Sequence, residues 1–114
     1  YLYSKDAAQI MLALGENGRS GKIYCLGSGN ARELRSYIEK IYDAVREYQQ
    51  KPEESIEQRE KHLGFGKIPY FDKQVMYLCA DIQDLEEDIG KITFTPFEKG
   101  IGETCKARLS KSVL

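Results

Sequence analysis

The sequence predicts a small α/β domain, in which a short sheet with strands near 22–26 and 74–80 is covered by about four helices. One observation is the apolar run at 23–26, which ends abruptly at Gly27 and Gly29 before a helical pattern begins. Another is the alternation of side chains over 74–80. Because apolar strands of this kind pair with neighbours in a sheet covered by helices, the segment at 23–26 is expected to be buried and the one at 74–80 to supply a second strand.

Helical spacing marks the segments that are expected to cover this sheet. Residues 5–14 carry apolar side chains three and four positions apart, with Ser4 or Asp6 available as the N-terminal cap. The strongest pattern follows the glycines, where Asn30 is expected to cap a helix and Glu33 to complete a variant of the capping box. The apolar stripe of that helix consists of Leu34, Tyr37, Ile38, Ile41, Tyr42 and Val45.

Two further helices are expected in the second half of the chain. Asp81 is expected to cap a short helix that ends at Gly90. The last helix is predicted to begin with Thr95 at the cap and Pro96 at the first helical position. Its buried stripe is predicted to consist of Phe97, Ile101, Cys105 and Leu109.

Residues 49–62 form a charged stretch that is interpreted as an insertion or as an extension of the preceding helix. Pro52 interrupts the stretch, Ile56 is its one large apolar residue, and the sole histidine of the chain, His62, lies at its end. No cysteine or second histidine accompanies His62, so no metal site is predicted.

Composition and charge narrow the classes of function. Acidic and basic residues are interspersed and leave a net charge of -1, so the basic patch typical of nucleic-acid binding is not expected. No apolar run approaches the ~20 residues of a membrane span, and no signal-peptide pattern opens the chain. The three cysteines, Cys25, Cys79 and Cys105, are interpreted as small buried thiols. A cytoplasmic protein with no nucleic-acid or membrane partner is therefore predicted.

Two glycine-containing turns match phosphate-binding loops only in part. Residues 18–22 precede a strand instead of a helix and lack the first glycine of a P-loop, so they are interpreted as a turn. Gly27-Ser28-Gly29 does follow the first predicted strand, but Arg32 occupies the place of the third glycine of a dinucleotide fingerprint. A tight turn at Gly29 before a capped helix is preferred over phosphate binding.

Residues suited to catalysis are scarce. The single histidine leaves no complete histidine–carboxylate–nucleophile set, and the acidic run at 86–88 is interpreted as a solvated helix face. Tyr1 and Lys5 fit the Tyr-x-x-x-Lys pattern, in which a lysine one helical turn away activates a proton-transferring tyrosine. A complete minimal dehydrogenase using this pair is the alternative to an accidental match.

The order of the segments resembles the C-terminal, substrate-side part of extended short-chain dehydrogenases, the NAD-dependent sugar-nucleotide epimerase/dehydratase/reductase family. Four landmarks, spread over nearly the whole chain, carry the resemblance. The segments 3–8 and 23–29 are similar to the family's short His-Val-x-Asp strand before a helix and to its "Tyr-Asn-Val-Gly-Ser-Gly" strand and turn. Residues 75–81 resemble a segment that ends in "Ala-Asp", and residues 95–104 resemble a closing "Pro-x-x-x-x-Gly-Ile-x-x-Thr" helix.

The resemblance implies that residues 1–114 form a single truncated C-terminal substrate-side domain with the charged stretch at 49–62 inserted or extending a helix. In the family, the glycine-rich NAD(P) loop and the catalytic tyrosine and lysine lie upstream of the first landmark. Tyr1 and Lys5 then match by accident, and no catalytic, cofactor-binding or metal residue is expected in this chain. NAD or NADP is expected in the full-length parent only.

The implied function is the substrate-side portion of an NAD(P)-dependent nucleotide-sugar epimerase, dehydratase or reductase, inert alone. The family often places an arginine and an aspartate just before the third landmark to meet the diphosphate and ribose, where this chain has Phe71 and Gln74. The candidates for substrate binding are Lys67, Tyr70, Gln74 and Tyr77, which could equally pack within a loop and strand. The alternative is a stand-alone small α/β binding or interaction module without catalysis.

Self-association is also predicted. The chain opens with Tyr1 in a segment that already has a structural pattern, which is typical of a piece of a longer protein. Separation from its neighbours is expected to leave apolar faces exposed on residues 23–26 or on the first helix, and such faces favour association between copies.

Overall fold

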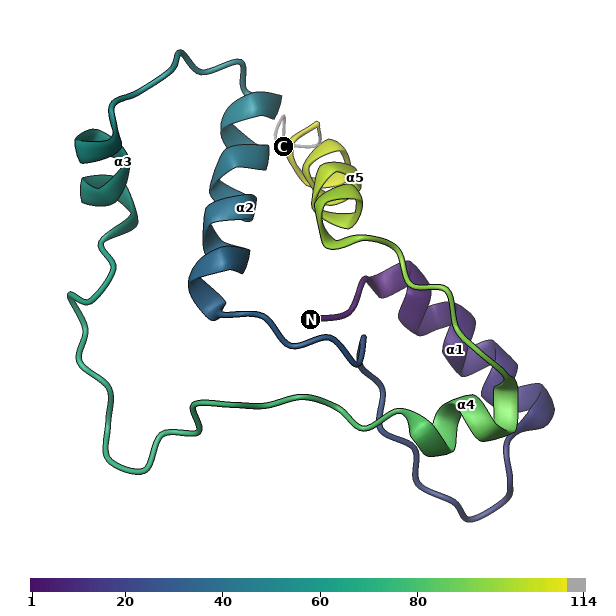
Figure 1. Ribbon diagram of the computed structural model, residues 1–114. Helices are drawn as coiled ribbons and strands as arrows, with labels where there is room; N and C mark the ends of the chain where they lie inside the picture. Colours follow the sequence, from purple (N-terminus) through teal and green to yellow (C-terminus); the bar gives the residue numbers. More distant parts are fainter. Residues whose placement is uncertain (111–114) are drawn as a thin grey trace. The chain divides into compact units, whose positions relative to one another are not determined.

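The computed structural model describes residues 1–110, which form α-helices joined by turns and extended segments (Figure 1). The helices are α1 (Ser4–Asn17), α2 (Leu34–Tyr48), α3 (Ile56–Leu63), α4 (Gln83–Ile89) and α5 (Phe97–Leu109). Within these described residues, no helix has the length and apolar character needed to cross a membrane.

The predicted α/β fold is wrong, because the described part of the chain is helical and contains no strand or sheet. A strand requires a neighbouring backbone that completes its ladder of hydrogen bonds. Neither 22–26 nor 74–80 has such a neighbour among the described residues. The burial expected for 23–26 fails as well, since Ile23 is 87% exposed. The apolar composition of these segments was interpreted as that of strands, whereas both segments are extended connections outside any sheet.

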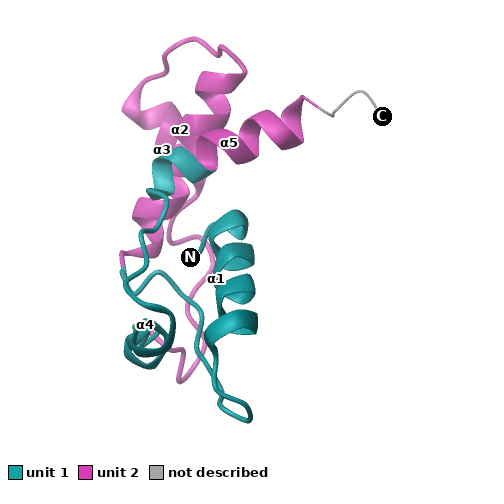
Figure 2. Cartoon of the chain, turned by 90° about the vertical axis from the view of Figure 1, so that its right-hand side faces the viewer, with its two compact units in different colours: residues 1–31, 77–100 teal, residues 32–76, 101–114 magenta. Residues whose placement is uncertain are grey.

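The chain divides into two compact units, each assembled from two separate stretches of sequence (Figure 2). Unit 1 contains Tyr1–Ala31 and Tyr77–Gly100, and unit 2 contains Arg32–Met76 with the chain from Ile101 onward.

Unit 1 is built on contacts between α1 and α4. Ile10 of α1 and Leu85 of α4 are its most buried large apolar side chains, at 3% and 1% exposure. Neither expected cap of α1 acts as one: Ser4 lies inside the helix, and the Asp6 carboxylate accepts hydrogen bonds from Thr95 instead. Thr95, expected to cap the last helix, is thereby used to join two distant segments of this unit.

The short helix α4 ends at Gly90 as the sequence predicts, but its N-cap residue is Ile82 and not Asp81. The Asp81 carboxylate accepts a hydrogen bond from the backbone N–H of Gln83 at 3.0 Å, at the first position of the helix. Gly90 ends the helix with a φ of 84°, and its own N–H donates to the carbonyl of Glu86. Because this φ is rarely adopted by other residues, glycine at this position stops the helix.

In unit 2 the charged stretch contains a helix of its own, α3, with a complete capping box. The Ser55 hydroxyl accepts from the backbone N–H of Gln58, and the Gln58 side chain accepts from the backbone N–H of Ser55. The capping box predicted at Asn30 is wrong, because α2 begins at Leu34 and its preceding residue, Glu33, makes no side-chain cap bond.

The predicted stripe of α5 is supported, because Cys105 is buried and its other members, Phe97, Ile101 and Leu109, are half-buried. The expectation of three buried thiols is wrong for the other two cysteines. Cys25 and Cys79 are both exposed, on the extended segments that were expected to be strands.

Candidate functional site

A shallow, open hollow of about 760 Å³ in unit 1 is a concave surface on which a small ligand could rest. One wall comes from the turn before α2, and the other comes from the approach to α4 and from α4 itself. The hollow is lined by Ser28, Gly29, Ala80, Asp81, Ile82, Gln83, Glu86, Glu87 and Lys91.

Two glycines allow the walls of the hollow to approach each other. A Cβ atom at Gly27 would lie 2.5 Å from the Cβ atom of Ala80, which is closer than carbon atoms can pack. A Cβ atom at Gly29 would lie 3.1 Å from Cδ1 of Ile82, and Gly29 also has a φ of 67°. The glycines that were interpreted as a tight turn therefore also permit close contact with a segment more than 50 positions away along the chain.

The hollow presents mostly hydrogen-bond acceptors. Asp81 accepts from the Gln83 backbone, Glu87 accepts from the Gln83 side chain at 3.3 Å, and Glu86 accepts from the backbone N–H of Ile92 at 3.3 Å. These bonds use only part of the capacity of each carboxylate, which can accept about four in total. The side chains of Ser28 and Lys91 add donors to the same surface. Such a lining suits a polar ligand rich in hydroxyl groups.

The residues that line the hollow offer binding groups but no nucleophile–base pair and no metal centre. Among the described residues, histidine, cysteine, aspartate and glutamate side chains nowhere gather in a group of three that could hold a metal ion. Ser28 is the one hydroxyl nucleophile in the lining, and its Oγ accepts from the backbone N–H of Asn30 at 3.3 Å, with no histidine beside it in the lining. The hollow can therefore orient a ligand, whereas bond-making chemistry would require groups from elsewhere.

On α4, Asp88 anchors the loop that follows α1. Its carboxylate accepts from the hydroxyl of Tyr24 at 2.5 Å, from Nε of Arg19 at 3.1 Å and from Nζ of Lys22 at 3.1 Å. The guanidinium of Arg19, followed by the Tyr24 hydroxyl, holds the pKa of the Asp88 carboxyl well below its usual range. This part of the acidic run at 86–88 is therefore a structural anchor and not merely a solvated face.

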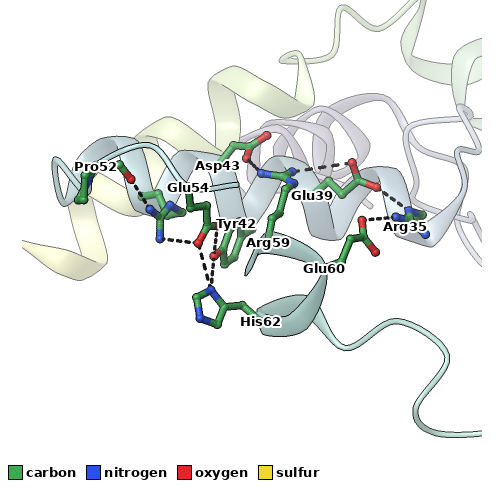
Figure 3. A network of polar contacts seen from close by, with 10 residues as sticks. Arg35, Glu39, Tyr42, Asp43, Pro52, Glu54, Arg59, Glu60 and His62 are labelled. Carbon is green, nitrogen blue, oxygen red and sulfur yellow. Dashed lines mark hydrogen bonds and ion pairs between the residues drawn. The ribbon is translucent and has the colours of Figure 1, made fainter. Parts of the chain in front are cut away.

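A second polar cluster, in unit 2, joins α3 to α2 (Figure 3). Arg59 of α3 pairs with Asp43 and Glu39 of α2, and its contact with Glu39 spans 3.8 Å. Arg35 of α2 donates to Glu39 at 2.7 Å and to Glu60 of α3 at 2.6 Å. The two arginines thus bridge carboxylates on both helices, and the cluster fixes α3 against α2.

At the other end of the same cluster, Tyr42, Glu54 and His62 form a closed triangle of contacts (Figure 3). The Tyr42 hydroxyl donates to Glu54 at 2.5 Å, and Nδ1 of His62 lies 3.1 Å from both the Tyr42 hydroxyl and the Glu54 carboxylate. The hydrogen bond with Tyr42 lowers the pKa of Glu54, and the same bond raises the pKa of Tyr42. Arg46 also contacts Glu54, at 3.5 Å. A tyrosine with a raised pKa keeps its proton, so the Tyr42 hydroxyl stays a hydrogen-bond donor to Glu54 and the triangle links α2, the segment before α3 and α3.

The four predicted substrate-binding residues are divided between the two units. Lys67, Tyr70 and Gln74 belong to unit 2, and Tyr77 belongs to unit 1. Lys67, Tyr70 and Tyr77 are exposed, Gln74 is half-buried, and none of the four lines the hollow. Their role in substrate binding stays a prediction. The Tyr1 ring meets the Phe97 ring edge-on at 6.0 Å between centroids, and Lys5 is exposed on α1.

Sequence reasoning missed most of the residues that build the hollow and the polar cluster. The Ser55-x-x-Gln58 pattern of α3 was available as a capping signal and could have placed that helix. No local sequence pattern could have placed Lys91 at the hollow, because its position there depends on how α4 packs in unit 1. The same holds for Asp88, whose partners lie more than 60 positions earlier in the chain.

No protein-family model matches this chain, and neither the curated proteins nor the solved structures contain a match to it.

Proposed function

We propose that this chain is the substrate-side portion of an NAD(P)-dependent enzyme that epimerises, dehydrates or reduces a nucleotide-linked sugar. The chain itself supplies binding surface for the sugar nucleotide. NAD or NADP and the proton-transferring residues belong to the remainder of the parent enzyme, so residues 1–114 alone are catalytically inert.

The observation that carries this proposal is the order of the four sequence landmarks, whose segments also meet in pairs within unit 1. The second and third landmarks touch where Gly27 approaches Ala80. The first and fourth meet where Asp6 accepts from Thr95 and where Gly100 faces the ring of Tyr3, at 3.3 Å from a Cβ placed on the glycine. Segments that are distant in sequence, and that resemble landmarks of one family, are thus neighbours in space. This proximity supports the proposal, although the strands that the resemblance implies are not formed within the described residues.

The chemistry of the hollow fits a sugar better than a diphosphate. Its carboxylates from Asp81, Glu86 and Glu87 accept hydrogen bonds from hydroxyl groups and repel phosphate oxygens. Lys91 is the one cationic side chain in the lining. With Phe71 and Gln74 in place of the family's arginine and aspartate, this chain offers little to the diphosphate, so other parts of the parent are proposed to hold it.

The cytoplasm is the proposed compartment. Two exposed thiols and one buried thiol are unpaired, and exposed unpaired cysteines are typical of a reducing environment.

Two experiments test this function. Reading the coding sequence upstream of Tyr1 should reveal a Gly-x-x-Gly-x-x-Gly strand–turn–helix and a second Tyr-x-x-x-Lys. A stop codon immediately upstream would favour a stand-alone binding module instead. In parallel, the purified chain is incubated with NAD⁺ or NADPH and a panel of UDP-, GDP- and dTDP-linked hexoses, and the products are separated by chromatography. No turnover is expected, and any sustained conversion would refute the inertness of this chain.

A further inference from the structure

Two of the three cysteines of the chain, Cys25 and Cys79, are exposed thiols of unit 1. The third, Cys105, is 7% exposed in α5 and belongs to unit 2. Neither exposed thiol is among the residues that line the hollow. Of the three pairs that three cysteines allow, Cys25 with Cys79 is therefore the one whose members are both accessible to an oxidant and both part of one compact unit.

The two thiols lie on segments that touch each other close to both cysteines. The Cα atom of Ala80, the residue after Cys79, lies 3.9 Å from the Cβ position of Gly27, which is two positions after Cys25. A Cα–Cβ bond adds about 1.5 Å, so the Cα atoms of Gly27 and Ala80 are at most about 5.4 Å apart. The Cα atoms of a disulfide-bonded pair lie about 4.4–6.8 Å apart. One and two positions away from the thiols, the two backbones thus approach to the spacing that a disulfide spans.

Both cysteines are held near this contact. The hydroxyl of Tyr24, which precedes Cys25, donates to Asp88 of α4 at 2.5 Å and so anchors this segment on its other side. The thiol of Cys79 lies 3.8 Å from the carbonyl oxygen of Ala80, so its sulfur is directed along the chain toward the contact. Because these described segments are extended connections outside any sheet, a small adjustment of the backbone breaks no ladder of hydrogen bonds.

The path of the chain gives a bridge between these thiols a distinct consequence. The chain leaves unit 1 after Ala31 and returns to it at Tyr77, so Cys25 precedes this excursion and Cys79 follows it. A bond between the two sulfurs would close a loop of more than 50 residues, which contains the whole of segment 32–76. Closing so long a loop strongly restricts the unfolded chain, whereas the folded chain needs only a local adjustment.

We propose that Cys25 and Cys79 form a reversible disulfide, which on oxidation joins the two ends of this excursion. The bridge is a redox-sensitive modification of the chain and not a permanent structural bond. Such a bridge is compatible with the reducing compartment proposed above, in which disulfides are transient. The proposal does not rest on the proposed enzymatic function.

The oxidant is a small-molecule disulfide, with glutathione disulfide as the probe. One cysteine thiolate attacks a sulfur of glutathione disulfide and releases one glutathione, which leaves a mixed disulfide on the protein. The other cysteine thiolate then attacks the protein sulfur of the mixed disulfide and releases the second glutathione. The two cysteines together lose two electrons and two protons, and the two glutathione molecules take them up as thiols.

The first test is oxidation of the reduced full chain in buffers of set glutathione and glutathione disulfide ratio, followed by alkylation, trypsin digestion and mass spectrometry. Cleavage after lysine and arginine places the three cysteines on separate peptides, residues 23–32, 74–91 and 100–106. The expected product is the first two peptides joined, with a yield that does not depend on protein concentration. No bridge, bridges to Cys105, bridges between copies, or mixed disulfides with glutathione alone would each overturn the proposal.

The second test measures whether the fold brings the two thiols together. The equilibrium constant for forming the bridge with glutathione disulfide is determined in native buffer and in concentrated urea. The constant should be about tenfold or more larger in native buffer, because the folded contact holds the sulfurs closer than a flexible loop of this length does. An equal or smaller constant in native buffer would show that the fold keeps the thiols apart.

Variants connect the bridge to these two residues. Oxidation should raise the urea midpoint of the wild-type chain by about 1 M or more. Cys25→Ser and Cys79→Ser should each abolish this rise, whereas the matched control, Cys105→Ala, keeps both exposed thiols and should keep it. Because Cys105→Ala also removes a buried sulfur, each variant is compared with its own reduced form. A rise that survives in either serine variant, or that is lost in Cys105→Ala, would contradict the assignment.

Discussion

The carboxylate of Asp6 in α1 accepts two hydrogen bonds from Thr95, one from its backbone N–H and one from its hydroxyl, both at 2.8 Å. Asp6 is 7% exposed, so the pair is shielded from water and joins the start of the chain to the segment before α5. It connects residues that are 89 positions apart within unit 1.

Removing this carboxylate should destabilise unit 1. Asp6→Ala leaves the N–H and hydroxyl of Thr95 without their acceptor, and the expected loss is about 1–3 kcal/mol in the free energy of unfolding. Urea unfolding followed by circular dichroism measures it. Asp72→Ala, at an exposed position, is the control and should change the free energy by less than about 0.5 kcal/mol. Equal effects would show that the Asp6–Thr95 contact contributes nothing specific.

Steric exclusion at the hollow predicts a rescue. Gly27→Ala places a Cβ against that of Ala80 and should cost about 1–3 kcal/mol, because one of the two segments must move. Ala80→Gly removes the atom that the new Cβ would meet. The double variant should therefore be more stable than the sum of the two single effects predicts, by most of the cost of Gly27→Ala. Gly102→Ala is the control, since nothing lies within 4 Å of its Cβ position in α5, and it should stabilise by about 1 kcal/mol. Additive behaviour of the two substitutions would contradict the close approach.

Acid should weaken unit 1 through Asp88. Because the folded-state pKa of Asp88 lies below its unfolded value, its contribution is complete above the ordinary aspartate range and is lost as the pH falls through the folded pKa. The stability difference between wild type and Asp88→Asn should therefore be largest near neutral pH and should shrink as the pH falls below about 4. Urea midpoints at a series of pH values measure this trend. A difference that stays constant or grows toward low pH would show that Arg19, Lys22 and Tyr24 do not act on this carboxylate.

The capping box of α3 should be needed to keep that helix formed. Ser55→Ala removes an acceptor for the backbone N–H of Gln58 and should cost about 1 kcal/mol, whereas Ser55→Asp should retain most of the stability. Hydrogen exchange of the α3 amides reports the local loss. Ser20→Ala, in an exposed turn, should leave α3 protection unchanged. Loss of α3 protection in both alanine variants would argue against a specific cap.

The helices could be predicted from local patterns, and the arrangement around them could not. The end of α4 at Gly90 and the buried stripe that includes Cys105 were predicted because both signals, a glycine after a helix and a helical spacing of apolar residues, lie within one short segment of sequence. The apolar run at 23–26 was misinterpreted because composition reports a preference for burial, whereas burial itself depends on a neighbour. A capping box was predicted at Asn30 and not at Ser55, although the residues three positions after each of them, Glu33 and Gln58, could both complete one.

The candidate site was predicted even less well than the fold. Gly27 and Gly29 were identified as special, but their contact with the approach to α4 depends on a distant segment. The residues chosen for substrate binding came from one loop and strand, whereas Asp81 and Lys91 come together through the packing of unit 1. Local sequence gives no direct measure of such pairings.

The most direct test of the proposed function is an amide NMR titration of the chain with UDP-glucose, GDP-mannose and dTDP-glucose, beside a titration with NAD⁺. At least one sugar nucleotide should shift the amides of Gly29 and Lys91. Lys91→Ala should weaken that binding about threefold or more, whereas Lys99→Ala, outside the hollow, should not. Shifts around residues 27–30 that come from NAD⁺ alone, with no response to any sugar nucleotide, would contradict the account.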